Sequence, residues 1–162
     1  MEKIRVLLAD DMEIIAQTIQ NILMKRNDIE VIYIAKDGEE EYNKIIELQP
    51  DLVFTDNQMP KMNGIDVIEK IYNSDIEKKP KFVFATADTD MELYRRAYKS
   101  GTIFVIRKPI DENRVKDAVE EYLAVIEDEK NPKISEENEI KEEKSKESFF
   151  KKIIKNFKER NK

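Results

Sequence analysis

The sequence contains no histidine and no cysteine among its 162 residues. Without cysteine the chain forms no disulfide bond, holds no thiolate metal site and has no cysteine nucleophile. Without histidine it lacks the commonest general base near neutral pH and any serine–histidine–aspartate triad. A metal site in this protein must therefore use oxygen ligands, which favours a hard cation such as Mg²⁺ or Ca²⁺.

Long apolar runs are also missing. No run in the sequence approaches the roughly 20 apolar residues that a membrane-spanning helix needs. The N-terminal segment, residues 1–11, has an apolar stretch that is too short and too soon followed by acidic residues for a signal peptide. We therefore expect a cytoplasmic protein.

Charged residues are numerous and unevenly distributed. They make up 40% of the chain, against about 25% in an average protein. Residues 1–126 carry 18 basic and 25 acidic side chains, whereas residues 148–162 carry 6 basic side chains and 1 acidic side chain. The acidic main part argues against a nucleic-acid-binding surface, so we expect no direct binding of nucleic acid.

Short apolar runs alternate with stretches of helical spacing along the first 126 residues. The runs typical of buried strands are 3–9, 31–35, 51–55, 81–86 and 103–106. The stretches typical of helices are 14–23, 38–48, 64–73, 89–100 and 111–126. This alternation predicts βαβ units, a parallel sheet and helices on both of its faces. We expect an α/β domain with a doubly wound, flavodoxin-like sheet of strand order 2-1-3-4-5 over residues 1–126.

The chain changes character after residue 126. Residues 127–147 contain only two isoleucines as apolar side chains, together with 9 acidic and 5 basic ones. Such a segment buries too little to offset the entropy of ordering, so we expect a disordered acidic linker. In residues 148–160 the phenylalanines and isoleucines fall within about 140° of a helical wheel and the lysines lie opposite. This segment is expected to form a basic amphipathic helix.

Three interpretations fit the expected helix at 148–160. Its phenylalanine and isoleucine face and its lysines fit peripheral contact with a membrane surface. They fit equally well docking into a groove of a partner protein, or onto the acidic surface of the main domain itself. A frayed tail without a role is the third interpretation.

Polar side chains follow the strands at the carboxyl edge of the expected sheet. In a sheet of this order, ligands bind in the crevice between the carboxyl ends of strands 1 and 3. Asp10 and Asp11 follow the first strand, Asp56 follows the third, Thr86 ends the fourth and Lys108 follows the fifth. Three close carboxylates repel one another, and a Mg²⁺ ion relieves this repulsion. A metal ion, an ammonium and a hydroxyl at one edge are suited to phosphoryl transfer onto a free carboxylate.

Four motifs lie along residues 1–126 in this order: LLADD (7–11), DNQMPKMNG (56–64), FVFATA (82–87) and GTIFVIRKP (101–109). Together they resemble the receiver domain of bacterial two-component response regulators, and the region is similar to the single-domain chemotaxis regulator. The resemblance implies a phosphorelay protein that accepts a phosphoryl group from a sensor histidine kinase or a phosphotransfer protein. It also implies that phosphorylation is signalled through protein contacts rather than through an enzymatic activity on another substrate.

The resemblance implies roles for individual residues. Asp56 would be the phosphorylation site. Mg²⁺ would be bound by Asp11, Asp56 and the main-chain carbonyl of Gln58, with Asp10 acting mainly through metal-bound water.

Further roles follow from the same motifs. Thr86 and Lys108 would contact the phosphoryl group, and the Lys108–Pro109 peptide bond would be cis. Gly64 is expected to serve the backbone geometry at the start of a helix. Gln58 and Asp88 would flank the site and affect the access of water.

One position departs from the family pattern. Receivers usually carry tyrosine or phenylalanine three residues before the lysine, where this chain has Val105. Phe104 is adjacent but points to the other face of the sheet by strand alternation. The helix 4–strand 5–helix 5 face is where the resemblance implies that phosphorylation is read out. Tyr94 and Lys99 on helix 4, with Tyr98 between them, are expected on the surface there.

Simpler interpretations exist for single residues. Asp10 with Glu13 three residues later matches a helix capping box. Thr86 alone is typical of an ordinary strand residue, and Lys108 alone of a surface lysine. Their shared position at one sheet edge favours the functional interpretation.

Three other functions compete with the receiver interpretation. A haloacid-dehalogenase-type hydrolase carries a second aspartate two residues after its nucleophile, where this chain has Gln58. A flavodoxin-like nucleotide binder needs a glycine-containing turn after strand 1, and residues 9–14 are acidic and lack glycine. The third alternative is a receiver-like interaction module that works without phosphorylation.

Overall fold

The computed structural model describes residues 2–131, 147–148, 150–152 and 154–155. By its internal contacts the chain divides into two units, Met1–Leu123 and Ala124–Lys162. The strands are β1 (Ile4–Ala9), β2 (Ile29–Ala35), β3 (Leu52–Asp56), β4 (Lys81–Thr86) and β5 (Thr102–Arg107). The helices are α1 (Glu13–Leu23), α2 (Gly38–Leu48), α3 (Gly64–Tyr72), α4 (Met91–Lys99) and α5 (Glu112–Lys130).

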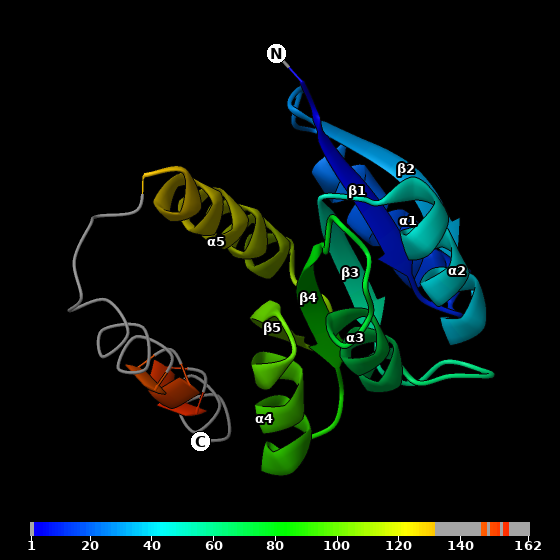
Figure 1. Ribbon diagram of the computed structural model, residues 1–162, viewed down its shortest axis with the longest axis vertical. Coiled ribbons are helices and arrows are strands. Elements are labelled where there is room, and N and C mark those ends of the chain that lie inside the picture. Colours follow the sequence, from blue (N-terminus) through cyan, green and yellow to red (C-terminus); the bar gives the residue numbers. More distant parts are fainter. Residues whose placement is uncertain (1, 132–146, 149, 153, 156–162) are drawn as a thin grey trace. The chain divides into compact units, whose positions relative to one another are not determined.

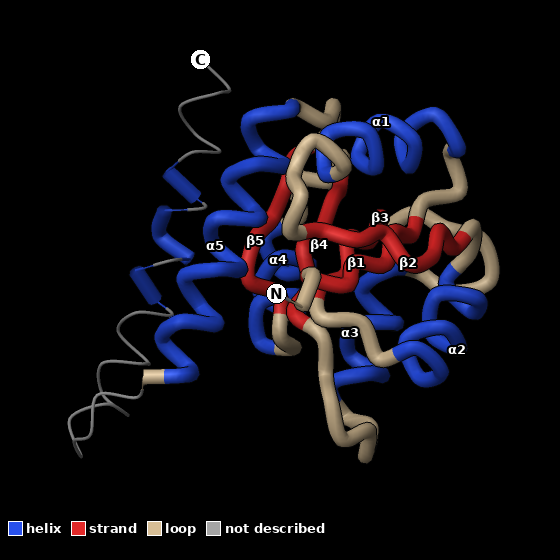
Figure 2. The backbone as a smooth tube through the Cα atoms, turned by 90° about the horizontal axis from the view of Figure 1, so that it is seen from above, coloured by secondary structure: helices blue, strands red, loops and turns tan. Residues whose placement is uncertain are grey.

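The strands form one parallel sheet of order β2-β1-β3-β4-β5. Figure 2 shows α1 on one side of this sheet and α2 and α3 on the other. Lys25, two residues after the end of α1, pairs with Glu112 of α5 at 2.8 Å, and Arg96 of α4 pairs with Glu69 of α3 at 2.8 Å. The helices therefore cover both faces, and the expected doubly wound fold is confirmed.

The sheet is stable because its strands are apolar enough to be buried from both sides. Every residue of β3 is buried, and Phe54, Phe82 and Phe84 are at most 1% exposed. Each helix packs mainly one of its faces against the sheet. In α3 this buried face includes Val67, Ile68 and Ile71, which are fully buried. This core holds the strand ends rigidly at the edge where the polar residues lie.

Most element boundaries lie within one residue of the sequence-based expectation, and the start of β2, the start of α4 and the end of α5 differ by more. Strand β2 begins at Ile29, two residues before the predicted start, and Ile29 pairs with Ile4 in β1. Helix α5 continues to Lys130, past the predicted end of the domain at residue 126. Residues 127–130 are exposed and charged, and glutamate and lysine are good helix formers that need no burial. These four residues are therefore helical rather than part of a disordered linker.

Most of the predicted linker, residues 132–146, lies outside the described residues. Of the predicted amphipathic helix, residues 148, 150–152, 154 and 155 are described, and all of them are helical. No helix among the described positions is long and apolar enough to cross a membrane.

Candidate functional site

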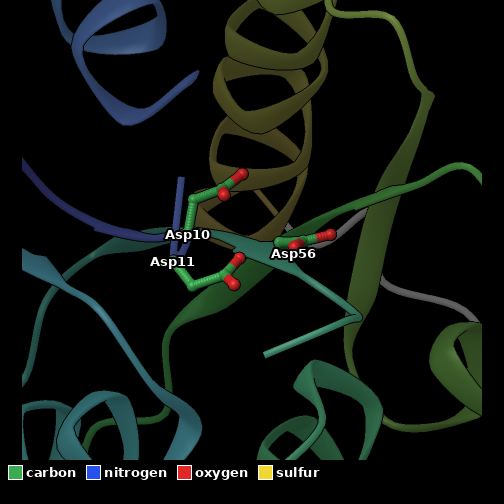
Figure 3. A group of neighbouring side chains, drawn as sticks. All are labelled: Asp10, Asp11 and Asp56. Carbon is green, nitrogen blue, oxygen red and sulfur yellow. The ribbon is translucent and has the colours of Figure 1, made fainter. Parts of the chain in front are cut away.

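The three aspartates of the predicted site come from two neighbouring strands. Asp10 directly follows β1, Asp11 is next along the chain, and Asp56 is the last residue of β3. Strands β1 and β3 pair in parallel up to Ala9 and Thr55, so both chains end at the same edge. Figure 3 shows the carboxylates of Asp10 and Asp11 reaching toward the end of β3, where Asp56 lies.

These carboxylates form a cluster that suits a hard cation. One oxygen of each of Asp10, Asp11 and Asp56 lies within 4.8 Å of the others. Asp10 and Asp56 are buried, and Asp11 is exposed, so the cluster is open on one side. Oxygen donors alone, with one side left for water and phosphate oxygens, are the ligand set that Mg²⁺ takes in proteins. The residues present therefore fit a magnesium ion.

Lys108 brings a positive charge to the same cluster. Its ammonium nitrogen lies 3.1 Å from Oδ1 of Asp56 and 3.2 Å from Oδ2 of Asp10. The Lys108 main-chain amide donates to the carbonyl oxygen of Thr86 at 2.9 Å, which ties the end of β5 to β4. The lysine side chain is only 16% exposed. It is a partner of the buried carboxylates rather than a solvated surface lysine.

The environment of Asp56 alters its acidity. Burial raises the pKa of the Asp56 carboxyl above its usual value, and the nearby charge of Asp10 acts in the same direction. The Lys108 ammonium and the main-chain amide of Gln58 oppose this increase in pKa by stabilising the carboxylate. The Gln58 side chain itself is exposed.

Thr86 ends β4 beside Asp56. In the β3–β4 ladder Asp56 pairs with Ala85, so Thr86 is one residue further toward the polar edge. Thr86 is 1% exposed, and its Oγ1 accepts a hydrogen bond from the main-chain amide of Asp88 at 3.0 Å. The threonine hydrogen remains available for donation to an oxygen atom at the site.

Gly64 has a different role from the one expected. A Cβ atom at this position would lie 2.2 Å from the main-chain oxygen of Asp56 and 2.8 Å from Oγ1 of Thr55. The glycine is therefore required for close approach of α3 to the end of β3, rather than for the backbone geometry of a helix start. The Lys108–Pro109 peptide bond is cis, as predicted.

Strand β5 has no aromatic side chain three residues before Lys108. Val105 there is buried, 6% exposed. Phe104 packs toward α5, where the guanidinium carbon of Arg114 lies 4.9 Å from the centre of its ring. The predicted opposite orientations of these two side chains agree with this arrangement.

The prediction that Tyr94 lies on the surface was wrong. Its side chain is 1% exposed, and its hydroxyl donates to the main-chain oxygen of Asp88. Leu93 and Ala97 are buried on the same helix. The spacing of 93, 94 and 97 groups these residues on one helical face, and this grouping is the signal that the sequence offers for Tyr94.

Sequence reasoning also missed Glu41. This glutamate is 0% exposed, its Oε2 accepts from the Thr55 hydroxyl at 3.0 Å, and its Oε1 has no hydrogen-bond partner. Burial raises the pKa of Glu41 well above its usual value; the bond from Thr55 opposes this, and the charge of Asp56 adds to it. Glu41 shares a helical face with Ile45 and Leu48, which is the only sequence signal that separates it from its exposed neighbour Glu39.

Comparison with known proteins agrees with this geometry. Residues 6–120 match the family described as the response regulator receiver domain. The chain is 34% identical over 108 residues to a protein-glutamate methylesterase/protein-glutamine glutaminase of Bdellovibrio bacteriovorus, covering 67% of this chain and 30% of that protein. A protein of the same description from Caulobacter vibrioides is 35% identical over 127 residues, covering 78% of this chain and 36% of the relative. The chain thus spans about a third of the length of these curated relatives.

Solved structures give the same result. The response regulator domain of Thermotoga maritima CheB is 25% identical, with a TM-score of 0.66 over 76% of this chain and 96% of that one. The CheX–CheY–BeF3–Mg complex of Borrelia burgdorferi contains a chain that is 27% identical, with a TM-score of 0.66 over 73% of this chain and 87% of that one. Family match, fold and the acidic edge of the sheet all agree: the chain belongs to the response regulator receiver domain family.

Proposed function

We propose that this receiver accepts a phosphoryl group on Asp56, from the phosphohistidine of a sensor histidine kinase or of a phosphotransfer protein. The observation that carries the proposal is the position of the Asp56 carboxylate. It is buried at the end of β3, lies 3.1 Å from the Lys108 ammonium, and is within 4.8 Å of Asp10 and Asp11. A carboxylate held among a cation and further acidic ligands is suited to attack on phosphorus.

In this step an Asp56 oxygen forms a bond to phosphorus, and the bond from phosphorus to the donor histidine nitrogen breaks. The nitrogen leaves with the electron pair and takes up a proton. The Lys108 ammonium and the Thr86 hydroxyl bind the phosphoryl oxygens and stabilise their charge. Attack by water later releases inorganic phosphate and restores the Asp56 carboxylate. This is the only chemistry proposed for residues 6–120, so no methylesterase or glutaminase activity is carried over to them.

We propose Mg²⁺ as the cofactor of this step. Asp11, Asp56 and the main-chain carbonyl of Gln58 would bind it, with Asp10 acting through water. The ion would supply positive charge to the phosphoryl oxygens. Magnesium titration by calorimetry tests this site: Asp11→Asn should abolish binding, and Asp75→Asn, at an exposed aspartate after α3, should leave it unchanged. Equal affinity of wild type and Asp11→Asn would contradict the metal site.

Incubation with acetyl phosphate and Mg²⁺, followed by intact-mass measurement, tests the acceptor. The wild-type chain should gain the mass of one phosphoryl group, and Asp56→Asn should gain none. Asp75→Asn serves as the matched control and should be phosphorylated like the wild type. No adduct on the wild type, or an undiminished adduct on Asp56→Asn, would refute the proposed function.

The partners follow from this chemistry. The phosphodonor must reach the open side of the carboxylate cluster, where Asp11 is exposed. We propose that the output protein binds the face formed by α4, β5 and α5, and that the chain works in the cytoplasm. That a similar receiver occurs in the CheX–CheY–BeF3–Mg complex supports signalling through protein contacts.

The proposed domain organisation has three parts: a receiver over residues 1–126, an acidic segment over 127–147 whose first four residues continue helix α5 to Lys130, and a basic amphipathic helix over 148–160. The helical state of residues 147–148, 150–152 and 154–155 supports the last part. With 6 basic residues and 1 acidic residue in 148–162, we favour peripheral contact of this helix with an anionic membrane surface.

A further inference from the structure

The buried hydroxyl of Tyr94 connects helix α4 to the loop that follows β4. Tyr94 lies in the first turn of α4, and this hydroxyl donates to the main-chain oxygen of Asp88. Burial raises the pKa of Tyr94 to about 12; the Arg107 charge opposes this, while Asp88 and Asp90 add to it. The hydroxyl is therefore protonated, and able to donate, throughout the neutral pH range.

Asp88 is bonded on its other side to the candidate site. Its main-chain amide donates to Oγ1 of Thr86 at 3.0 Å. The peptide groups of Asp88 therefore link two hydroxyls: the amide of Asp88 is bonded to the Thr86 hydroxyl, and its carbonyl oxygen is bonded to the Tyr94 hydroxyl. A displacement of the Thr86 hydroxyl must strain or break the first bond, and the second bond transmits that change to α4.

A second set of hydrogen bonds also connects Asp88 to the first turn of α4. The Asp88 carboxylate accepts from the Asp90 amide at 2.9 Å, and the Asp90 carboxylate accepts from the Glu92 amide at 2.9 Å. Asp90 is the N-cap residue of α4. The loop is therefore anchored to the first turn of α4 both by the carboxylates of Asp88 and Asp90 and by the side chain of Tyr94.

Strand β5 offers no hydroxyl-bearing aromatic to this loop. Val105 is an aliphatic residue, and the Phe104 ring packs against the Arg114 guanidinium. The aromatic hydroxyl that reaches this loop belongs to Tyr94 of α4. Figure 1 shows α4 at the far end of the loop that leaves β4.

We infer that Tyr94 is a positioning residue: through Asp88 it fixes the Thr86 hydroxyl for the phosphoryl group and couples the phosphorylation state of the site to α4. The inference rests on the proposed function, because it requires Thr86 to bind a phosphoryl oxygen. Tyr94 touches neither the phosphoryl group nor the metal ligands in this scheme. It acts through the Asp88 peptide group.

The test uses the complete chain with Tyr94→Phe, which removes one oxygen atom and keeps the buried ring. The matched control is Tyr72→Phe, which removes the same atom from a ring that is 50% exposed at the end of α3. Tyr94→Phe should fold and retain its Mg²⁺ affinity, but acetyl phosphate should phosphorylate it about fivefold more slowly than the wild type, equivalent to about 1 kcal/mol. Addition of beryllofluoride and Mg²⁺ changes the amide chemical shifts of residues 91–99. In Tyr94→Phe these changes should be less than half as large as in the wild type.

A double-mutant comparison separates positioning from a general loss of stability. In a Thr86→Val background the hydroxyl that Tyr94 positions is gone, so adding Tyr94→Phe should change the phosphorylation rate no further. Tyr94→Phe behaving like Tyr72→Phe in rate and in the α4 shifts would overturn the inference. An undiminished effect in the Thr86→Val background would overturn it too. Failure of the wild type to be phosphorylated would instead refute the proposed function.

Discussion

The ammonium nitrogen of Lys108 lies 3.1 Å from Oδ1 of Asp56, at the end of the sheet. The same nitrogen is 3.2 Å from Oδ2 of Asp10, so one cation neutralises two buried carboxylates. If the lysine charge were removed, the two carboxylates would be left without a counter-charge. An uncompensated charge in a poorly hydrated site destabilises the folded state. The lysine therefore both stabilises the acidic edge and competes with any other cation that binds there.

Lys108→Met should have opposite effects on metal binding and on phosphorylation. Mg²⁺ affinity should rise, because the repulsion between the ammonium and the ion disappears. The rate of phosphorylation by acetyl phosphate should fall at least about tenfold, since a hydrogen bond to a charged group contributes about 1.5–3 kcal/mol. Calorimetry and intact-mass kinetics measure the two quantities. Lys61→Met, at an exposed lysine of the β3–α3 loop that is 3.5 Å from Asp37, is the control, and equal behaviour of both variants would contradict the role of Lys108.

Glu41→Gln should stabilise the protein at neutral pH but not at acidic pH. The folded-state pKa of Glu41 is raised by burial, whereas the unfolded chain ionises near its usual pKa of about 4.3. Between these two pKa values the folded state binds one more proton than the unfolded state. The wild-type free energy of unfolding therefore falls as pH rises through this window, by at most about 1.4 kcal/mol per pH unit.

Chemical denaturation between pH 4 and pH 8 measures this difference. The advantage of Glu41→Gln over the wild type should grow as pH increases from about 4.3. Glu39→Gln, at an exposed position two residues earlier in α2, is the matched control. A constant difference between Glu41→Gln and the wild type across this range would show that Glu41 is ionised in the folded protein.

Gly64→Ala should destabilise the fold although alanine is the better helix former. The new Cβ would lie 2.2 Å from the main-chain oxygen of Asp56, and neither the strand nor the helix can move freely away from it. Overpacking of this kind costs about 1–3 kcal/mol in unfolding free energy. Gly101→Ala is a useful comparison, because its added methyl meets no atom within 4 Å. Any destabilisation there comes from the φ of +97°, which disfavours alanine, and not from a close contact. Should Gly64→Ala prove at least as stable as the wild type, the close approach at Asp56 would be disproved.

Deletion of residues 148–162 should leave phosphorylation by acetyl phosphate unchanged and abolish binding to anionic vesicles. Full-length chain should sediment with vesicles of anionic lipid but not with neutral ones, because attraction to an anionic surface is worth about 1 kcal/mol per basic residue. Reversing the charge at Lys151 and Lys155 keeps the length and should also abolish sedimentation. If the full chain and the deletion variant sediment equally, the membrane contact is excluded, and docking into a partner groove or onto the main domain is tested next.

Much of the site followed from the order of residues alone. Apolar runs alternating with helical stretches predict a parallel sheet, and the carboxyl ends of parallel strands share one edge. These two facts place five residues at one edge from the sequence alone: Asp10, Asp11, Asp56, Thr86 and Lys108. The positions of polar residues directly after buried strands, rather than any single motif, made this possible.

Other features depended on which atoms meet in the folded chain. The sequence shows which residues share a helical face, but not which face packs inward, so Tyr94 was misplaced on the surface and Glu41 was overlooked. The role of Gly64 depends on how closely α3 approaches the end of β3, and no residue pattern encodes that distance.

By itself the sequence determined the fold class, the family and the edge of the sheet where the acidic residues gather, because periodicity and strand order are local properties of the chain. Only the tertiary structure decided that Lys108 bridges two carboxylates, that Tyr94 reaches the Asp88 peptide and that Glu41 is buried with one bonded oxygen. Those contacts join segments far apart in the chain, and hydrogen-bond distances between such segments are set by the packing of the core.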